Sequence, residues 1–251
     1  VIMNIDWNAE DYHKNFAFVY EYGEALLNLF TLPKGSFIAD VGCGSAVLTK
    51  KLKEAGYGVC GIDASREMTE LAKRNAPDIP FMCADATEFS LDRPADGLFS
   101  NAVFHWIDDT DKLVKNLARN LRAGGELVCE FGGKGCAESV HSALEEIFAE
   151  RGLKYRRTFN FLSIGEFAPV LEKHGLVPVY CTLFPRPTRQ SGEEGLKNWI
   201  LTFLKEPFEA IADDLRGEII AEAEKRLRAK LYKDGEWFVD YVRIRVKAVK
   251  A

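Results

Sequence analysis

The sequence of 251 residues contains no apolar run that approaches the length of a membrane span, and its start shows no signal-peptide pattern. An excess of positive charge is also missing, because 33 Lys and Arg stand against 38 Asp and Glu, for a net charge of −5. General binding of nucleic acid or of an anionic membrane normally needs a basic face. We therefore predict a cytoplasmic protein that binds neither nucleic acid nor membrane, and we leave open whether it is a monomer or a homodimer.

Cysteine is present without the pattern that a disulfide framework or a zinc site needs. The sequence has six cysteines and no C-x-x-C pair, and most of the six fall in or beside stretches that predict buried strands. His141 and His174 have no companion at metal-ligand spacing, so we interpret both as structural. We therefore expect reduced, buried thiols and no metal site.

A glycine turn between a strand and a helix is the most informative local feature. Residues 37–41 form a short apolar run without helical periodicity, which predicts a buried parallel strand, and Gly42 and Gly44 interrupt it before a helical pattern starts near Val47. Glycine adopts the backbone angles of a tight turn and lets a ligand lie against the main chain. The helix N-terminus that follows suits a nucleotide-like or carboxylate-bearing ligand.

Two acids distinguish between the ligands that such a turn binds. A dinucleotide fingerprint would place its third glycine at Val47 and needs no acid inside the strand. Here Asp40 precedes Gly42 by two residues, and Asp63 follows about 20 residues later at the end of a second predicted strand. This D-x-G-x-G-x-A pattern with its second acid resembles motif I and the ribose-binding acid of class I S-adenosylmethionine (SAM) methyltransferases. The alternative is an ordinary turn with a surface aspartate.

Strands and helices alternate along residues 37–83, which predicts a doubly wound parallel α/β sheet with right-handed crossovers. In such a sheet the ligand lies across the carboxyl ends of the strands. Asp40, Asp63 and Asp85 each fall at such an end, so we expect three acids around one crevice. Asp85 has an alternative role as the cap of the turn that starts at Ala86.

Two segments carry the most specific signal, FSNAVFHWI at residues 99–107 and LRAGG at residues 121–125. With a helix expected between them, they resemble the trans-aconitate methyltransferase-like group, also labelled type 11 methyltransferases, and the likeness extends over nearly the whole chain. The resemblance implies one domain, residues 1–251, with a mostly parallel sheet of seven strands. It also implies an N-terminal helical lid (1–34), a SAM-binding core (35–131) and a helical cap from two insertions (132–162 and 191–235).

The same resemblance implies SAM as the cofactor and S-adenosyl-L-homocysteine as its product. Asp63 would hold the ribose hydroxyls, Asp40 would lie near the methionine end, and Asp85 would accept from the adenine amino group. Ala46 stands where many members of the group have a third glycine, so its methyl narrows the approach of the methionine moiety. The predicted cofactor-binding residues are Tyr12, Asp40, Gly42, Cys43, Gly44, Asp63, Ala64, Met68, Asp85, Ala86 and Asn101.

The acceptor decides which other residues matter. Methyl transfer depends on alignment of the nucleophile, the methyl group and the sulfur, which can be worth about 7–11 kcal/mol, and it requires no metal. A carboxylate acceptor is already ionised near pH 7, so it needs no base, but it does need a cationic anchor. The candidate anchors lie in the predicted cap and its loops: Arg156, Arg157, Arg186 and Arg189.

A hydroxyl or amine acceptor would instead need a general base. His105 is the predicted catalytic residue for that case, because an ordinary histidine pKa of about 6.5 suits the role. The alternative is that His105 only forms hydrogen bonds within its loop. We favour a SAM-dependent methyltransferase of a small molecule, with an organic acid as the preferred acceptor. An NAD(P) oxidoreductase on a Rossmann sheet and a SAM-binding protein without catalysis remain open.

Overall fold

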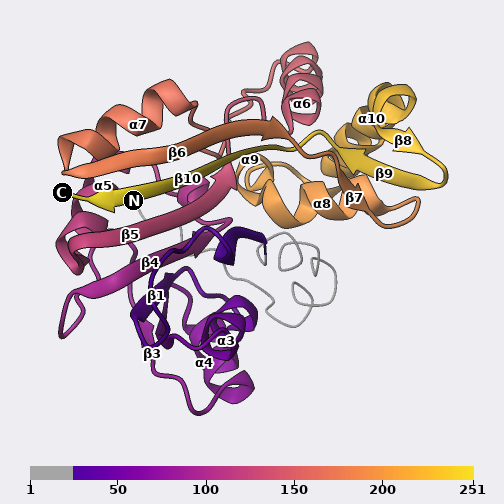
Figure 1. Ribbon diagram of the computed structural model, residues 1–251. Helices are drawn as coiled ribbons and strands as arrows, with labels where there is room; N and C mark the ends of the chain where they lie inside the picture. Colours follow the sequence, from indigo (N-terminus) through magenta and orange to yellow (C-terminus); the bar gives the residue numbers. More distant parts are fainter. Residues whose placement is uncertain (1–24) are drawn as a thin grey trace. The chain divides into compact units, whose positions relative to one another are not determined.

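The computed structural model describes residues 25–251, which fold into two compact units (Figure 1). The sheet unit contains residues 25–131, Leu162–Leu183 and Ile244–Ala251, and the insert unit contains Gly132–Phe161 and Phe184–Arg243. The insert unit therefore extends beyond the predicted second insertion at both of its ends. Most of the predicted N-terminal lid lies outside the described residues.

A sheet of seven strands forms the centre of the sheet unit and confirms the predicted doubly wound α/β fold. Its strand order is β3-β2-β1-β4-β5-β10-β6. The pairs β1–β2, β1–β4, β2–β3 and β4–β5 are all parallel. β10 and β6 run in opposite directions (Figure 1), so the sheet is mixed and mostly parallel. Its strands are β1 (Phe37–Val41), β2 (Gly58–Asp63), β3 (Phe81–Cys83), β4 (Ala95–Asn101), β5 (Leu121–Gly132), β6 (Leu176–Pro185) and β10 (Val242–Lys250).

Helices cover both faces of this sheet, because successive side chains of a strand point to opposite faces and both sets are apolar. On one face Ala39 and Leu98 pack in a core that α5 and α7 complete. On the other face Ile38 and Phe99 pack in a second core with α3 and α4. The helices of this unit are α3 (Val47–Glu54), α4 (Arg66–Asn75), α5 (Thr110–Asn120) and α7 (Ile164–Lys173), with the 3-10 turn η1 (Phe104–Trp106) before α5.

A buried row of charges ties the segment before β1 to β5 and β10. Lys247 Nζ on β10 lies 2.9 Å from Glu126 Oε1 on β5 and also donates to Thr31 Oγ1 at 3.0 Å. The second oxygen of Glu126 accepts from the Thr31 N–H at 2.9 Å. Arg245, which is half-buried, and the buried Glu130 form a second pair, with 2.6 Å between nitrogen and oxygen. Each of these buried charges is therefore matched by its opposite, as burial of an ion requires.

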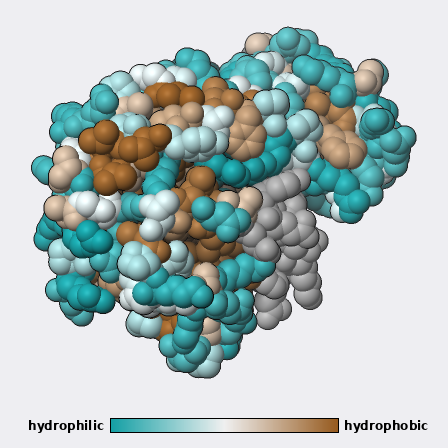
Figure 2. Space-filling view, viewed as in Figure 1, coloured by the Kyte–Doolittle hydropathy of each residue, from teal (hydrophilic) through white to brown (hydrophobic). Residues whose placement is uncertain are grey.

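The strand β6 lies at the edge of the sheet and exposes several apolar side chains. Val177, Val179 and Tyr180 are 46%, 58% and 43% exposed. Figure 2 shows apolar surface where this strand runs in Figure 1. An open edge of this kind invites pairing with another strand, and Pro178, which has no N–H to offer, interrupts its ladder.

The insert unit combines helices with a small sheet, whereas the cap predicted at 132–162 and 191–235 is helical. β7, β9 and β8 form an antiparallel sheet in that order. Trp199 and Trp237 are buried within the unit. Within residues 25–251, every helix is too short or too polar to cross a lipid bilayer. The elements are α6 (Glu138–Glu150), β7 (Thr188–Gln190), α8 (Gly195–Phe203), α9 (Lys205–Phe208), α10 (Asp213–Leu231), β8 (Tyr232–Lys233) and β9 (Glu236–Val239).

The last strand also differs from its prediction. The alternating pattern of residues 236–246 predicts one strand, but the structure divides it into β9, which ends at Val239, and β10, which begins at Val242. Asp240 lies between them, and its Oδ2 accepts from the N–H and the hydroxyl of Ser139 at 3.0 and 2.6 Å. Its carbonyl oxygen accepts from the Ala137 N–H at 3.0 Å. Asp240 thus caps α6, and its carbonyl oxygen is engaged outside the sheet.

Replacement of Lys247 with methionine should destabilise the fold strongly, because it leaves Glu126 buried without its cation. Loss of one partner of a buried pair costs about 3–5 kcal/mol. Urea unfolding followed by circular dichroism measures this loss. Lys73→Met is the control, since Lys73 pairs with Glu70 on an exposed surface and such pairs contribute less than about 1 kcal/mol. Equal effects of the two substitutions would contradict the role of the charged row.

Candidate functional site

Polar side chains gather at the carboxyl edge of the parallel strands. Asp40 lies one residue before the end of β1, in register with β2 and β4, and Asp63 ends β2, in register with the end of β3. Asp85 follows β3, and Asn101 ends β4. Because parallel strands end at the same edge of a sheet, the fold brings these side chains to one side of the sheet unit.

The turn after β1 depends on two glycines with positive φ, 80° at Gly42 and 51° at Gly44. A Cβ on Gly42 would lie 2.1 Å from Val103 Cγ2, so no side chain has room there. A Cβ on Gly44 would meet no atom within 4 Å. Gly42 therefore serves the packing of two loops, whereas Gly44 leaves its backbone open to a ligand.

Two alanines beside this turn adopt the same left-handed backbone. Ala46, at the N-cap of α3, has a φ of 69°, and Ala102, directly after β4, has a φ of 62°. This conformation costs a residue other than glycine about 1–2 kcal/mol. Strained backbone of this kind is concentrated at functional sites. Glycine would adopt the angles of Ala46 without strain.

The carboxylate of Asp63 joins the turn after β1 to the turn after β2. Its Oδ2 accepts from the Gly44 N–H and its Oδ1 from the Ser65 N–H, both at 2.9 Å. Ser65 also caps α4, because its Oγ accepts from the Met68 N–H at 3.2 Å. Burial raises the pKa of Asp63, and the two backbone donors oppose that rise. Each oxygen keeps a second lone pair with which it can accept from a hydroxyl group of a ligand.

Asp40 is a buried carboxyl group, 2% exposed, whose Oδ2 accepts from Thr49 Oγ1 on α3 at 2.6 Å. Burial raises the pKa of Asp40 to about 7, although the Thr49 hydroxyl opposes the rise. A cationic group brought beside it would favour the ionised form. Thr49 was not predicted as a site residue, although its place on the helix that directly follows the strand of Asp40 is a signal for such a role.

Asp85 caps the turn that starts at Ala86, because its Oδ1 accepts from the Thr87 N–H at 2.6 Å. This bond confirms the capping alternative for one oxygen of the carboxylate, and the adenine contact of Asp85 stays a prediction. The amide of Asn116 on α5 fixes the same loop by donating to the carbonyl oxygens of Ala86 and Phe89, each at 3.1 Å. A role for Asn116 was also missed, since no local pattern links it to a loop so distant in sequence.

The other predicted cofactor residues lie near the same edge or outside the described residues. The side chains of Cys43 and Met68 are buried, at 6% and 4% exposure. Ala64 is exposed directly after β2, and Ala86 is buried in the loop after β3. Tyr12 lies outside the described residues. The contacts of all these residues with a cofactor stay predictions.

His105, the predicted base, lies in η1 shortly after the end of β4. Its side chain is buried, at 8% exposure, and its ring centroid lies 5.5 Å from that of Trp106. His105 therefore lies in the segment that leaves β4 directly after Asn101. Its role as a base stays a prediction. Among residues 25–251, no cluster of three or more His, Cys, Asp or Glu side chains has the arrangement that holds a metal ion.

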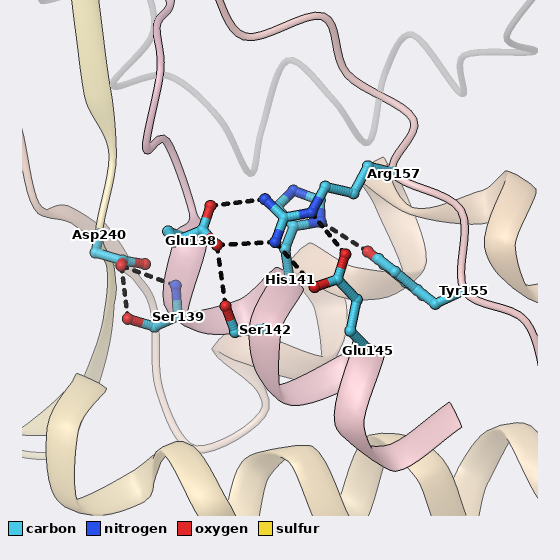
Figure 3. A network of polar contacts seen from close by, with 8 residues as sticks. All are labelled: Glu138, Ser139, His141, Ser142, Glu145, Tyr155, Arg157 and Asp240. Carbon is cyan, nitrogen blue, oxygen red and sulfur yellow. Dashed lines mark hydrogen bonds and ion pairs between the residues drawn. The ribbon is translucent and has the colours of Figure 1, made fainter. Parts of the chain in front are cut away.

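Arg157, one of the four candidate anchors, is already bound to two carboxylates of the insert unit. Its guanidinium donates to both oxygens of Glu138 and of Glu145 on α6, at 2.6 to 3.0 Å (Figure 3). These bonds raise the pKa of Arg157. Beside it, His141 Nδ1 lies 2.7 Å from the Tyr155 hydroxyl, and burial lowers the pKa of His141 to about 4. His141 is therefore neutral at pH 7, in keeping with a structural role.

The other three candidate anchors also belong to the insert unit. Arg156 forms an ion pair with Glu206 at 2.9 Å, and its side chain is 75% exposed. The guanidinium of Arg186 lies 5.0 Å from the centroid of the Phe184 ring. Arg189 is 62% exposed. Neither Arg156 nor Arg189 has the buried surroundings that make binding of an anion strong.

Comparisons with known proteins agree with this arrangement. A family model described as a methyltransferase domain matches residues 39–129. The chain is 30% identical to an uncharacterized methyltransferase of Schizosaccharomyces pombe, over 97% of this chain and 98% of that protein. It is 28% identical to the trans-aconitate 2-methyltransferase of Rhizobium etli, over 84% of this chain and 86% of the relative.

Solved structures show the same fold. Phosphoethanolamine N-methyltransferase 2 of Haemonchus contortus, in complex with S-adenosyl-L-methionine, superposes with a TM-score of 0.57. The match covers 97% of this chain and 60% of that one, at 18% sequence identity. At this level of identity the likeness concerns the fold.

Asp40 should make the stability of the protein depend on pH. Its folded pKa of about 7 lies above the value of about 3.9 for an unfolded aspartate. Between these values the unfolded chain is ionised while the folded chain keeps its proton, so the stability falls as the pH rises, by up to about 1.4 kcal/mol per pH unit. Asp40→Asn should therefore become more stable relative to the wild type between pH 5 and pH 8.

Urea unfolding of the protein without ligand, carried out at several pH values in this interval, measures the difference between wild type and Asp40→Asn. The conservative variant keeps a side chain of the same shape and removes only the ionisation. Asp92→Asn, at an exposed residue outside this site, is the control and should follow the wild type. A difference between Asp40→Asn and wild type that stays constant across the interval would refute the assignment.

Proposed function

The chain belongs to the methyltransferases that use S-adenosylmethionine, and on that premise we propose that it methylates a small molecule, namely a carboxylate of an organic acid. The observation that supports this acceptor is the likeness to the trans-aconitate 2-methyltransferase of Rhizobium etli. That likeness covers 84% of the chain. The sheet unit holds a smaller share of the residues, so the likeness includes part of the insert unit. The oxidoreductase alternative falls away with the assignment of the family.

The chemistry of the carboxyl edge suits the cofactor. Gly44 leaves its backbone open, and the carboxylate of Asp63, oriented by two backbone donors, suits a pair of ribose hydroxyls. The buried Asp40 suits a cationic group. We infer that these residues, with Asp85, hold the cofactor. When bound, SAM supplies a methyl group on a positively charged sulfur.

A carboxylate acceptor makes few chemical demands on the protein. Its ordinary pKa of about 4 leaves it ionised at pH 7, so no residue has to remove a proton. The side chains then serve to align the acceptor and to exclude water. Under this proposal His105 acts by its position against Trp106 and not as a base.

The state of the cysteines supports a reducing compartment, such as the cytoplasm, for this reaction. All six are free thiols: Cys43, Cys60, Cys83, Cys129, Cys136 and Cys181. Proteins of oxidising compartments commonly pair such residues.

Asp63→Ala should weaken binding of S-adenosylhomocysteine by about 1–3 kcal/mol, because charge-assisted hydrogen bonds to the ribose are lost. Isothermal titration calorimetry measures the affinity, and circular dichroism checks that the variant is folded. Asp78→Ala is the matched control, since Asp78 forms an exposed ion pair with Lys53. An affinity of Asp63→Ala equal to that of the wild type would remove the ribose assignment.

A panel of acceptors tests the proposed substrate class. The protein is incubated with SAM and organic acids that include trans-aconitate, with phenols and with amines, and the products are examined by mass spectrometry for one added methyl group. We expect base-labile methyl esters of the acids. Methylation of phenols or amines alone would refute the proposal.

His105→Gln separates the two chemistries in the same panel. Esterification of a carboxylate should lose less than about tenfold in rate, whereas a reaction that needs His105 as a base should lose about 10²–10⁴-fold. A folded variant that binds S-adenosylhomocysteine normally yet loses all acid methylation would contradict the role given to this residue.

A further inference from the structure

Arg243, the last residue of the insert unit, is a buried cation without a polar partner. It lies at the start of β10 and is 6% exposed. Its Nε is buried without a hydrogen bond, and across residues 25–251 its guanidinium forms neither a hydrogen bond nor an ion pair. A buried charge is normally paired, because removal of an ion from water is costly. An arginine in this state lacks the anion that would compensate it.

The neighbouring cations show how unusual this is. Arg245, two residues further along the same strand, pairs with Glu130 at 2.6 Å. Lys247 pairs with Glu126 at 2.9 Å. Even Arg216, whose Nε is also buried without a partner, donates through another nitrogen to the carbonyl oxygen of Ile211 at 3.1 Å. Within the described residues, the lack of a hydrogen bond or ion pair at Arg243 is therefore not shared by the other cations of its strand or by Arg216 of its unit.

Arg243 rests on a platform that holds it in place. Its guanidinium carbon lies 4.9 Å from the centroid of the Tyr241 ring. Trp199 Nε1 donates to the Tyr241 hydroxyl at 2.6 Å, and both of these aromatic side chains are buried, at 2% and 8% exposure. A guanidinium above an aromatic face keeps its N–H groups free at its edge, which is the orientation needed to donate to an oxyanion.

One acid, Asp240, lies near this platform, and its Oδ1 is buried without a hydrogen bond. Asp240 uses one carboxyl oxygen to cap α6 through Ser139. Burial raises the pKa of the Cys136 thiol to about 11, so this thiol stays protonated at pH 7. The charges of Arg243 and Asp240 both lie close enough to influence it. A single guanidinium close to an acid suits one carboxylate, with its single negative charge, better than a doubly charged phosphate.

We propose that Arg243, supported by Tyr241, is an anion-binding site of the insert unit that takes the carboxylate group of a small organic acid. The proposal rests on the proposed function for the identity of its ligand, and it replaces the four arginines suggested by the sequence. The planar fork of its guanidinium matches the two oxygens of that group, so lysine cannot fully replace it.

The test is equilibrium binding of trans-aconitate, measured by calorimetry on the full-length protein saturated with S-adenosylhomocysteine, so that no transfer occurs. Wild type, Arg243→Gln, Arg243→Lys and Arg189→Gln are compared. We expect Arg243→Gln to weaken binding at least tenfold, Arg243→Lys to lie between it and the wild type, and Arg189→Gln to bind as the wild type does. Affinity for S-adenosylhomocysteine should be the same in all four.

Thermal unfolding without ligand provides a second readout that a structural role would not produce. Because Arg243→Gln removes an uncompensated buried charge, its melting temperature should equal or exceed that of the wild type. An arginine that only stabilises the fold would give a lower value. The same titrations with inorganic phosphate and with acetate show which oxyanion the site prefers.

Several results would overturn the proposal: equal affinity of Arg243→Gln and wild type for trans-aconitate, a loss at Arg189 instead, binding of phosphate alone, or no binding of any of these anions by the wild type. Failure of the proposed function is recognised separately. In that case S-adenosylhomocysteine itself does not bind, and titration of the anions into the unliganded protein still decides whether Arg243 holds one.

Discussion

The hydrogen bonds of one carboxylate, Asp63, organise the candidate site. Its two oxygens accept from the backbone of Gly44 and of Ser65, so the turn after β1 and the turn after β2 keep a constant separation. The loop after β4 joins them because Val103 fills the space in which a side chain of Gly42 would lie. Three loops at the carboxyl edge are thereby held together by backbone and packing contacts, which a bound ligand need not create for itself.

The protein deals with its buried charges in different ways. In the sheet unit, opposite charges on β5 and β10 compensate each other, and these pairs also secure the segment that leads into β1. Asp40 avoids the cost of an isolated charge because its raised pKa lets it keep a proton near neutral pH. Within residues 25–251 Arg243 forms no hydrogen bond or ion pair, and it cannot lose its proton, since a guanidinium stays charged. In the proposed site a bound carboxylate compensates this charge.

Local sequence patterns predicted much of the sheet unit. The alternation of apolar runs and helical stripes indicated the parallel strands, and Ser65 marked the start of α4. The insert unit followed its prediction less well. Its small sheet consists of short strands that alternation does not distinguish from loops. The break at Asp240 arises from hydrogen bonds to Ser139, a residue about a hundred positions earlier, which no local pattern contains.

The sequence by itself determined the class of ligand and predicted the strand ends that bind it, because a glycine turn and an acid at the end of a strand are local features of the chain. Only the tertiary structure decided which charged side chains are engaged. Arg157 looked available in the sequence, but two glutamates of α6 surround it. The sequence assigned no role to Arg243, but the fold buries it beside Tyr241 without a hydrogen bond or ion pair to any of residues 25–251. The pairing of a charge depends on which distant residues packing brings within a few ångströms of it, and the order of residues along one strand does not contain that information.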